Sequence, residues 1–144
     1  MFRIQEILQS DKKPKEKVEL LAKHSQKNKK YFADLMAYFT NASSGERGHC
    51  ISAMTIVVNS KPEFIGPYFD FVIKQLNDKA NRIKWEAAEI VAKVAKHFPD
   101  KAAGAIPKLL ENTREKEIVV RWSVAFALTE IAKSNPKLQK EFTT

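Results

Sequence analysis

The chain has 144 residues and a mass of 16.4 kDa, the size of one ordinary domain that can bury a substantial core. Apolar residues make up 44 % of it and charged residues 29 %, which excludes global disorder, and a single cysteine excludes a disulfide framework. Lys and Arg number 25 against 17 Asp and Glu, and this net charge of +8 admits an acidic partner without naming one.

The amino-terminal segment carries most of the positive charge. Residues 1–30 contain nine Lys and Arg and four Asp and Glu, a net +5. Residues 2–9 and 14–27 are typical of a helix pair, in which lysines alternate with Glu16 and Glu19. This basic segment has two interpretations. It is either a solvated helix face whose charges pair with one another, or a docking patch for phosphates or an acidic protein.

Internal repetition with an offset of 37 residues is the strongest pattern in the chain. It relates three prolines, three basic positions, the residue six positions before each basic one, and an apolar position. These sets are Pro62, Pro99 and Pro136; Arg47, Lys84 and Arg121; Asn41, Asp78 and Glu115; and Leu35, Val72 and Leu109. The offsets predict a degenerate first pair over 2–28, repeats over 29–61, 62–98 and 99–135, and a short cap over 136–144.

The first helix of each repeat is predicted over 29–40, 62–77 and 99–113. Pro62 and Pro99 suit the first turn of a helix, where the missing N–H has no partner to lose. Pro67 and Pro107 lie further in, so we expect each to kink or split its helix.

The second helix of each repeat is predicted from apolar residues at i, i+4, i+7, i+8 and i+11. Only the first position of the first set, Glu46, departs from this pattern. The sets are Glu46, Cys50, Ala53, Met54 and Val57; Ile83, Ala87, Ile90, Val91 and Val94; and Val120, Val124, Ala127, Leu128 and Ile131.

Residues 106–132 (IPKLLENTREKEIVVRWSVAFALTEIA) resemble a HEAT repeat. That family alternates a first helix bearing a proline with a second helix opened by Val-Arg, which an acidic residue precedes by six positions. Three sites in the chain match this pattern. Val120-Arg121 with Glu115 fits it well, Ile83-Lys84 with Asp78 fits it approximately, and Glu46-Arg47 with Asn41 fits it least. The resemblance implies an all-α fold over residues 1–144, a right-handed α-α superhelix of about four helical pairs.

The repeated basic and acidic residues have two interpretations. In HEAT proteins such residues form a hydrogen-bonded ladder between neighbouring repeats, since a turn carboxylate can accept from the cation of an adjacent unit. A row of cations could instead follow a phosphate backbone. The resemblance implies the structural ladder for Arg47, Asp78, Lys84, Glu115 and Arg121.

The outer face of the second helices is the candidate binding surface, because in two-helix solenoids these helices line the concave side. Two tryptophans recur there at the repeat offset, each with a lysine eleven residues further on. Packing of each indole over the neighbouring repeat is the alternative. The predicted partner-binding residues are Trp85, Glu89, Lys96, Trp122, Phe126 and Lys133.

Signals for enzymatic chemistry are weak. Cys50 falls on an apolar stripe and is expected to be an inert core residue. His49 adjoins it but points about 100° away on a helix, which is unsuited to a chelate. No nucleophile or phosphate-loop motif is present in the sequence, so we predict no catalytic residue, no metal and no cofactor.

The function expected from these features is a non-enzymatic scaffold module that binds a protein or peptide. The alternative is a nucleic-acid-binding protein related in fold to the alkylpurine DNA glycosylases, which the HEAT resemblance admits. This chain is shorter than those enzymes, and Trp85 with Glu89 is the nearest match to their Trp and Asp pair. Self-association stays open. The sequence has neither a membrane-length apolar run nor a signal-peptide layout, so we expect a cytoplasmic protein.

Overall fold

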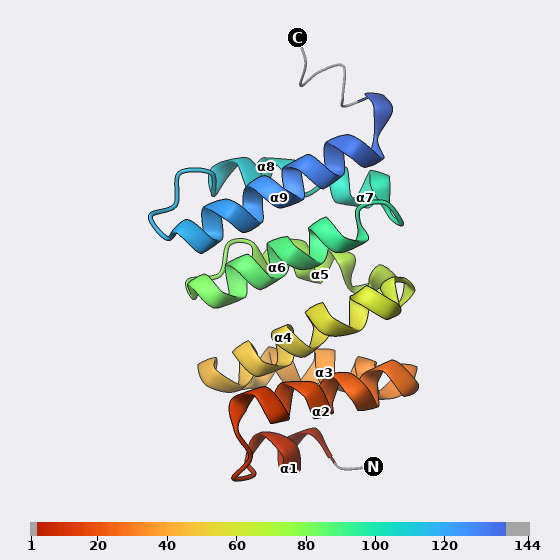
Figure 1. The fold of residues 1–144 in the computed structure, drawn as a ribbon, viewed down its shortest axis with the longest axis vertical. Helices are drawn as coiled ribbons and strands as arrows, with labels where there is room; N and C mark the ends of the chain where they lie inside the picture. Colours follow the sequence, from red (N-terminus) through yellow and green to blue (C-terminus); the bar gives the residue numbers. More distant parts are fainter. Residues whose placement is uncertain (1–2, 138–144) are drawn as a thin grey trace. The chain divides into compact units, whose positions relative to one another are not determined.

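Helices and short turns make up the whole of the described chain, residues 3–137, in a computed structural model (Figure 1). No strand occurs between these residues, which confirms the all-α prediction. Contacts divide the chain into two compact units, Met1–Phe64 and Ile65–Thr144. The predicted cap over 136–144 lies outside the described residues from position 138 onward. Within residues 3–137 no helix combines the length and apolarity needed to cross a membrane.

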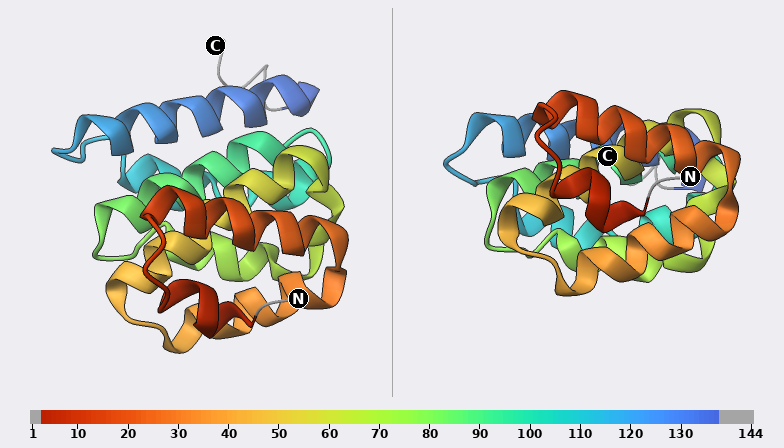
Figure 2. Two further views of the ribbon diagram at one scale, coloured as in Figure 1. Left: turned by 60° about the horizontal axis from the view of Figure 1, so that its bottom comes forward. Right: turned by 90° about the horizontal axis from the view of Figure 1, so that it is seen from below.

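The first unit contains four helices, in which α2 packs against α3 and α4, and α1 packs against α2 and α3 (Figure 2). Side chains cap two of them: the Asn28 carboxamide accepts from the backbone N–H groups of Lys30 and Tyr31, and the Ser43 hydroxyl accepts from that of Glu46. The helices are α1 (Ile4–Leu8), α2 (Pro14–Lys27), α3 (Lys29–Asn41) and α4 (Ser44–Ser60).

The second unit is built around two long helices, α6 and α9, which pack along one another. Helix α5 packs against α6, while α7 and α8 pack against α9. A 3₁₀ segment, η1 (Pro62–Tyr68), leads into this unit. The helices are α5 (Phe69–Gln75), α6 (Asn81–Val94), α7 (Pro99–Ala103), α8 (Ile106–Glu111) and α9 (Ile118–Ser134).

The internal prolines divide the two helices in which they were predicted to do so. The segment 62–77 forms η1, which contains Pro67, and then α5; the segment 99–113 forms α7 and α8, with Pro107 in the first turn of α8. Gly66 allows a close approach in η1, because a Cβ there would lie 3.3 Å from the Phe98 ring. The prediction of split first helices is therefore confirmed.

The apolar stripes of the second helices form the core as predicted. All five stripe residues of α6 are buried, with 0–1 % of their surface exposed, and so are four of the five in α9. Leu128 is the exception and is only half-buried. A buried hydrogen bond joins the two repeats of this unit, since the Asn112 side chain donates to the Leu76 carbonyl at 2.7 Å.

Candidate protein-binding face on helix α9

Helix α9 is apolar on two opposite sides. One side is buried and belongs to the core, and the other side is open. The exposed face of α9 carries one charged residue, Lys133, at its carboxyl end. We call the six uncharged exposed residues of this face the α9 strip, which consists of Ile118, Val119, Trp122, Ala125, Phe126 and Thr129. An amphipathic surface helix normally places polar residues opposite its core stripe, so α9 departs from the usual pattern.

Two aromatic side chains dominate the strip. Trp122 is 66 % exposed and Phe126 is 40 % exposed, and they are i, i+4 neighbours that lie side by side on a helix. Ile118 and Val119 add 46 % and 38 % exposed apolar surface one turn earlier. Contiguous exposed apolar surface of this kind marks an interaction site more often than isolated exposed residues do.

The same face of α6 is not open. The positions 37 residues before the strip are half-buried or buried, including Ala88 at 0 % and Ala92 at 4 % exposure. One of them, Glu89, accepts a hydrogen bond of 3.4 Å from Ser123 on α9, so this side of α6 meets the next second helix. The matching side of α9 bears Phe126 in place of Glu89.

The six predicted partner-binding residues fall into two groups. On α9, Trp122 and Phe126 are open, and Lys133 is exposed near the carboxyl end with its Nζ 3.4 Å from Glu130 Oε1. On α6, Trp85 and Glu89 are half-buried, while Lys96 is exposed just beyond the helix end. The assignment of all six to partner binding stays a prediction, and the exposed aromatic surface is concentrated on α9.

A turn held by two cations fixes the start of α9. Lys84 Nζ on α6 lies 2.5 Å from Glu115 Oε1, and both side chains are largely buried. Arg121 donates to the carbonyls of Glu115 and Lys116 at 2.7 and 3.0 Å. These contacts stabilise the turn from the preceding repeat and from α9 itself, which orients the strip that follows.

The other two predicted ladder residues have local contacts. The Asp78 carboxylate accepts from the backbone N–H of Ala80 at 2.9 Å and so closes the turn before α6. In the first unit, the Arg47 guanidinium lies 4.8 Å from the centre of the Phe39 ring, a cation–π distance. The ladder as a whole stays a prediction.

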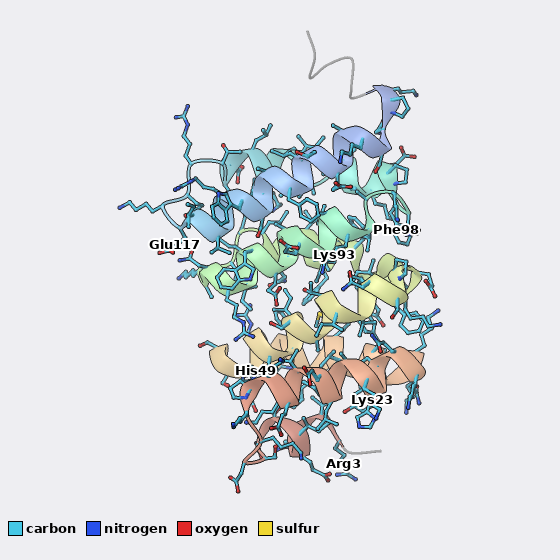
Figure 3. All side chains as sticks on the ribbon, viewed as in Figure 1. Arg3, Lys23, His49, Lys93, Phe98 and Glu117 are labelled. Atoms are coloured by element: carbon cyan, nitrogen blue, oxygen red, sulfur yellow. The ribbon has the colours of Figure 1, made fainter. Side chains whose placement is uncertain are left out.

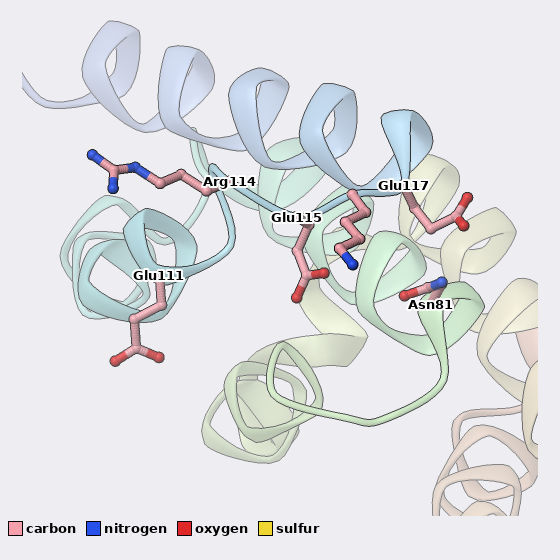
Figure 4. Close-up of a pocket in the computed structure, with 6 residues that line it drawn as sticks. Asn81, Glu111, Arg114, Glu115 and Glu117 are labelled. Atoms are coloured by element: carbon pink, nitrogen blue, oxygen red, sulfur yellow. The ribbon is translucent and has the colours of Figure 1, made fainter.

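A cavity of about 460 Å³ adjoins the turn before α9 (Figure 4). Figure 4 shows the carboxylates of Glu111 and Glu115 on separate segments, and that of Glu117 pointing away from both. Among residues 3–137 no three His, Cys, Asp or Glu side chains are grouped so that they could hold a metal ion.

Burial shifts the pKa of two side chains in the first unit, the Cys50 thiol and the His24 imidazole. Cys50 is fully buried, which confirms its core assignment, and burial raises the pKa of its thiol to about 12. A thiol with that pKa holds almost no thiolate near neutral pH and is a poor nucleophile. Burial, followed by nearby positive charge, lowers the pKa of His24, whose ring lies 5.3 Å from that of Tyr31.

Sequence reasoning missed Ile118 and Val119 as part of the open face (Figure 3, where Glu117 marks the start of α9). The signal was available, because the segment 118–129 contains one charged residue, Arg121, and apolar residues on all sides. Such a helix is typical of one that is covered on both faces.

No protein-family model matches the chain, and no curated protein matches it. Among solved structures, an engineered protein from a structural genomics consortium is similar, with a TM-score of 0.66 and 17 % sequence identity. The similarity covers 92 % of this chain and 63 % of the engineered protein, so the chain spans less than two thirds of that neighbour's length. At this identity the likeness establishes an all-helical fold and nothing about activity.

Proposed function

We propose that the chain is a HEAT-like module that binds another protein through the α9 strip and has no enzymatic activity of its own. The observation that carries the proposal is the 66 % exposure of Trp122 beside an exposed Phe126. Tryptophan is enriched among the residues that dominate protein interfaces, because a large rigid side chain removes much apolar surface from water. The HEAT resemblance supports the same role, since solenoid repeats commonly present binding surfaces.

Charge favours a protein partner over nucleic acid at this face. Phosphate binding depends on several Lys and Arg side chains that release counterions from the nucleic acid. The strip itself has none, and Arg121, on the flank of α9, donates to its own turn. Lys133 lies at one end of the helix, where it can orient an acidic group of a protein partner.

The test is site-specific photo-crosslinking. A photoreactive phenylalanine analogue replaces Phe126 in one variant and Lys101, an exposed residue of α7, in the control. We expect defined protein adducts from position 126, reduced at least several-fold when Trp122→Ala is added, and none of these adducts from position 101. Adducts that are absent, or equal at both positions, would contradict the proposal.

The nucleic-acid alternative has its own readout in the same protein. Fluorescence anisotropy with labelled duplex and single-stranded oligonucleotides is measured at 50 and 200 mM salt. A protein that contacts 6–10 phosphates loses roughly 10³–10⁵ in affinity over this range. We expect only weak binding at 50 mM salt, and tight binding that collapses at 200 mM would favour the alternative instead.

A further inference from the structure

We infer that the partner of the α9 strip is a second copy of this chain, with the two α9 helices packed antiparallel about a two-fold axis. The axis passes between Ala125 and Phe126, at the middle of the strip. This inference rests on the proposed function, because it uses the same surface and names its occupant. The arguments are the spacing of the strip, the sizes of its side chains and its charges.

The spacing of the strip suits another helix. Its central members Ile118, Trp122, Ala125 and Thr129 are separated by four, three and four residues, the spacing with which one helix packs along another. In the preceding repeat the matching side of α6 meets a helix, as the Glu89 and Ser123 contact shows. The strip therefore has the position and the pattern of a helix-packing face, and within residues 3–137 no helix covers it.

The side-chain sizes of the strip complement themselves in the antiparallel arrangement. Trp122 of each copy falls opposite Thr129 of the other, so a large side chain meets a small one twice. Ala125 falls opposite Ala125 of the second copy, where the small side chains allow the helices to approach closely. Phe126 falls beside Phe126 of the second copy, an arrangement that allows an offset or edge-to-face aromatic pair. Alternation of large and small residues across facing helices is what close packing requires.

The charges of the face permit two copies of a basic protein to meet. Each chain carries +8, so two copies repel at long range, but none of the six strip residues is charged and Lys133 is the single charged residue exposed on this face of α9. Lys133 continues the open face beyond Thr129, and its Nζ lies 3.4 Å from Glu130 Oε1, so its charge is partly offset within its own chain.

A two-fold contact uses the same patch on both partners and closes at two copies. The strip is one face of one helix, which is small beside the ~800 Å² that each partner of a typical stable complex buries. We therefore expect a weak, concentration-dependent dimer and no larger assembly.

Sedimentation equilibrium over a wide concentration range, at 50 and 500 mM salt, tests the dimer. We expect association that strengthens with salt, because salt screens the repulsion between two +8 chains while apolar burial is retained. Trp122→Ala should weaken the dimer by about tenfold or more, since truncated interface tryptophans often have effects of this size. The control is Leu110→Ala on α8, also exposed at 51 % but outside the strip, which should change the dissociation constant by less than about twofold.

The two-fold register has a separate test. Ala125→Cys places two thiols opposite each other across the axis, whereas Lys101→Cys on α7 does not. A disulfide forms when the two Cα atoms lie roughly 4.4–6.8 Å apart. If the two positions 125 lie within that range, mild oxidation should give a covalent dimer from Ala125→Cys and little from Lys101→Cys. The native Cys50 is fully buried and serves as the unreactive background in both variants.

The outcomes separate this inference from the proposed function. A chain that sediments as a monomer at every concentration, yet gives adducts to a different protein from position 126, overturns the second copy as partner and retains the protein-binding function. A monomer without such adducts overturns both. A dimer that Trp122→Ala leaves unchanged, or that Lys101→Cys captures as readily as Ala125→Cys, overturns the α9 contact.

Discussion

Helices α6 and α9 occupy the same place in consecutive repeats and bury the same stripe, but their opposite faces differ. The outer positions of α6 include Glu89, which hydrogen bonds to Ser123 on α9, and small alanines that are buried. The same positions of α9 include Trp122 and Phe126, which are open. The two helices therefore share a buried apolar stripe and differ in whether the opposite face is covered.

Truncation of a side chain in the buried apolar stripe of α6 or of α9 should lower the free energy of unfolding by similar amounts. These are the largest effects we expect from any substitution. Ile90→Ala on α6 and Ile131→Ala on α9 each remove a side chain that is 1 % exposed. Each should lower the free energy of unfolding by about 2–5 kcal/mol, because the removed methyl groups leave a cavity. Urea denaturation of both variants measures this. A loss under about 1 kcal/mol in only one helix would show that the two stripes are not equivalent.

The outer faces should respond differently when α9 is made to resemble α6. Phe126→Glu introduces the residue found at the matching α6 position, and it places a charge in the middle of the strip. We expect association through α9 to weaken about tenfold or more, because the carboxylate must be desolvated without a partner. Helical content, measured by circular dichroism, should be retained. Unchanged association would mean that the strip is not the contact surface.

The contact between the repeats should contribute less than either core stripe. Lys84 and Glu115 are 15 % and 28 % exposed, so their ion pair is partly shielded from water. A double-mutant cycle of Lys84→Met and Glu115→Gln should give a coupling energy of about 1 kcal/mol. A coupling energy indistinguishable from zero in urea denaturation would show that other contacts hold this turn.

The smallest effect is expected from pH, and it lies in the first unit. Burial lowers the pKa of His24 below 6.5, so the folded state favours the neutral imidazole. The unfolded chain then binds more protons, and stability should be full above about pH 6.5 and decline as the pH falls below it. His24→Gln should flatten this decline between pH 7 and 5 in thermal unfolding, while His97→Gln, an exposed control, should not. Equal slopes in both variants would contradict a role for His24 burial.

The all-helical fold was readable from the sequence because it depends on local patterns. Proline positions gave the split first helices, and the apolar spacing gave the buried stripes of α6 and α9. Both features depend on the chemistry of a few neighbouring residues, which a single sequence displays. The HEAT resemblance and the single-domain expectation extend beyond such patterns and stay predictions.

The residues of the candidate binding face could be predicted from the sequence only in part. Trp85 and Trp122 lie 37 residues apart at matching positions, so spacing alone could not distinguish them, and exposure or packing stayed open for both. The structure gives them different exposures, because burial depends on what lies against each helix. The contact of Lys84 with Glu115 of the following repeat was expected from the family resemblance, whereas the exposure of Ile118 and Val119 was not expected.

Single-tryptophan fluorescence tests most directly whether the α9 strip is the face that a second copy covers. Trp85→Phe leaves Trp122 as the reporter, and Trp122→Phe leaves Trp85. With rising protein concentration, Trp122 emission should shift to shorter wavelength and its quenching by acrylamide should fall, while Trp85 emission stays constant. A Trp122 that remains fully quenchable at every concentration, or a Trp85 that responds equally, would contradict this assignment.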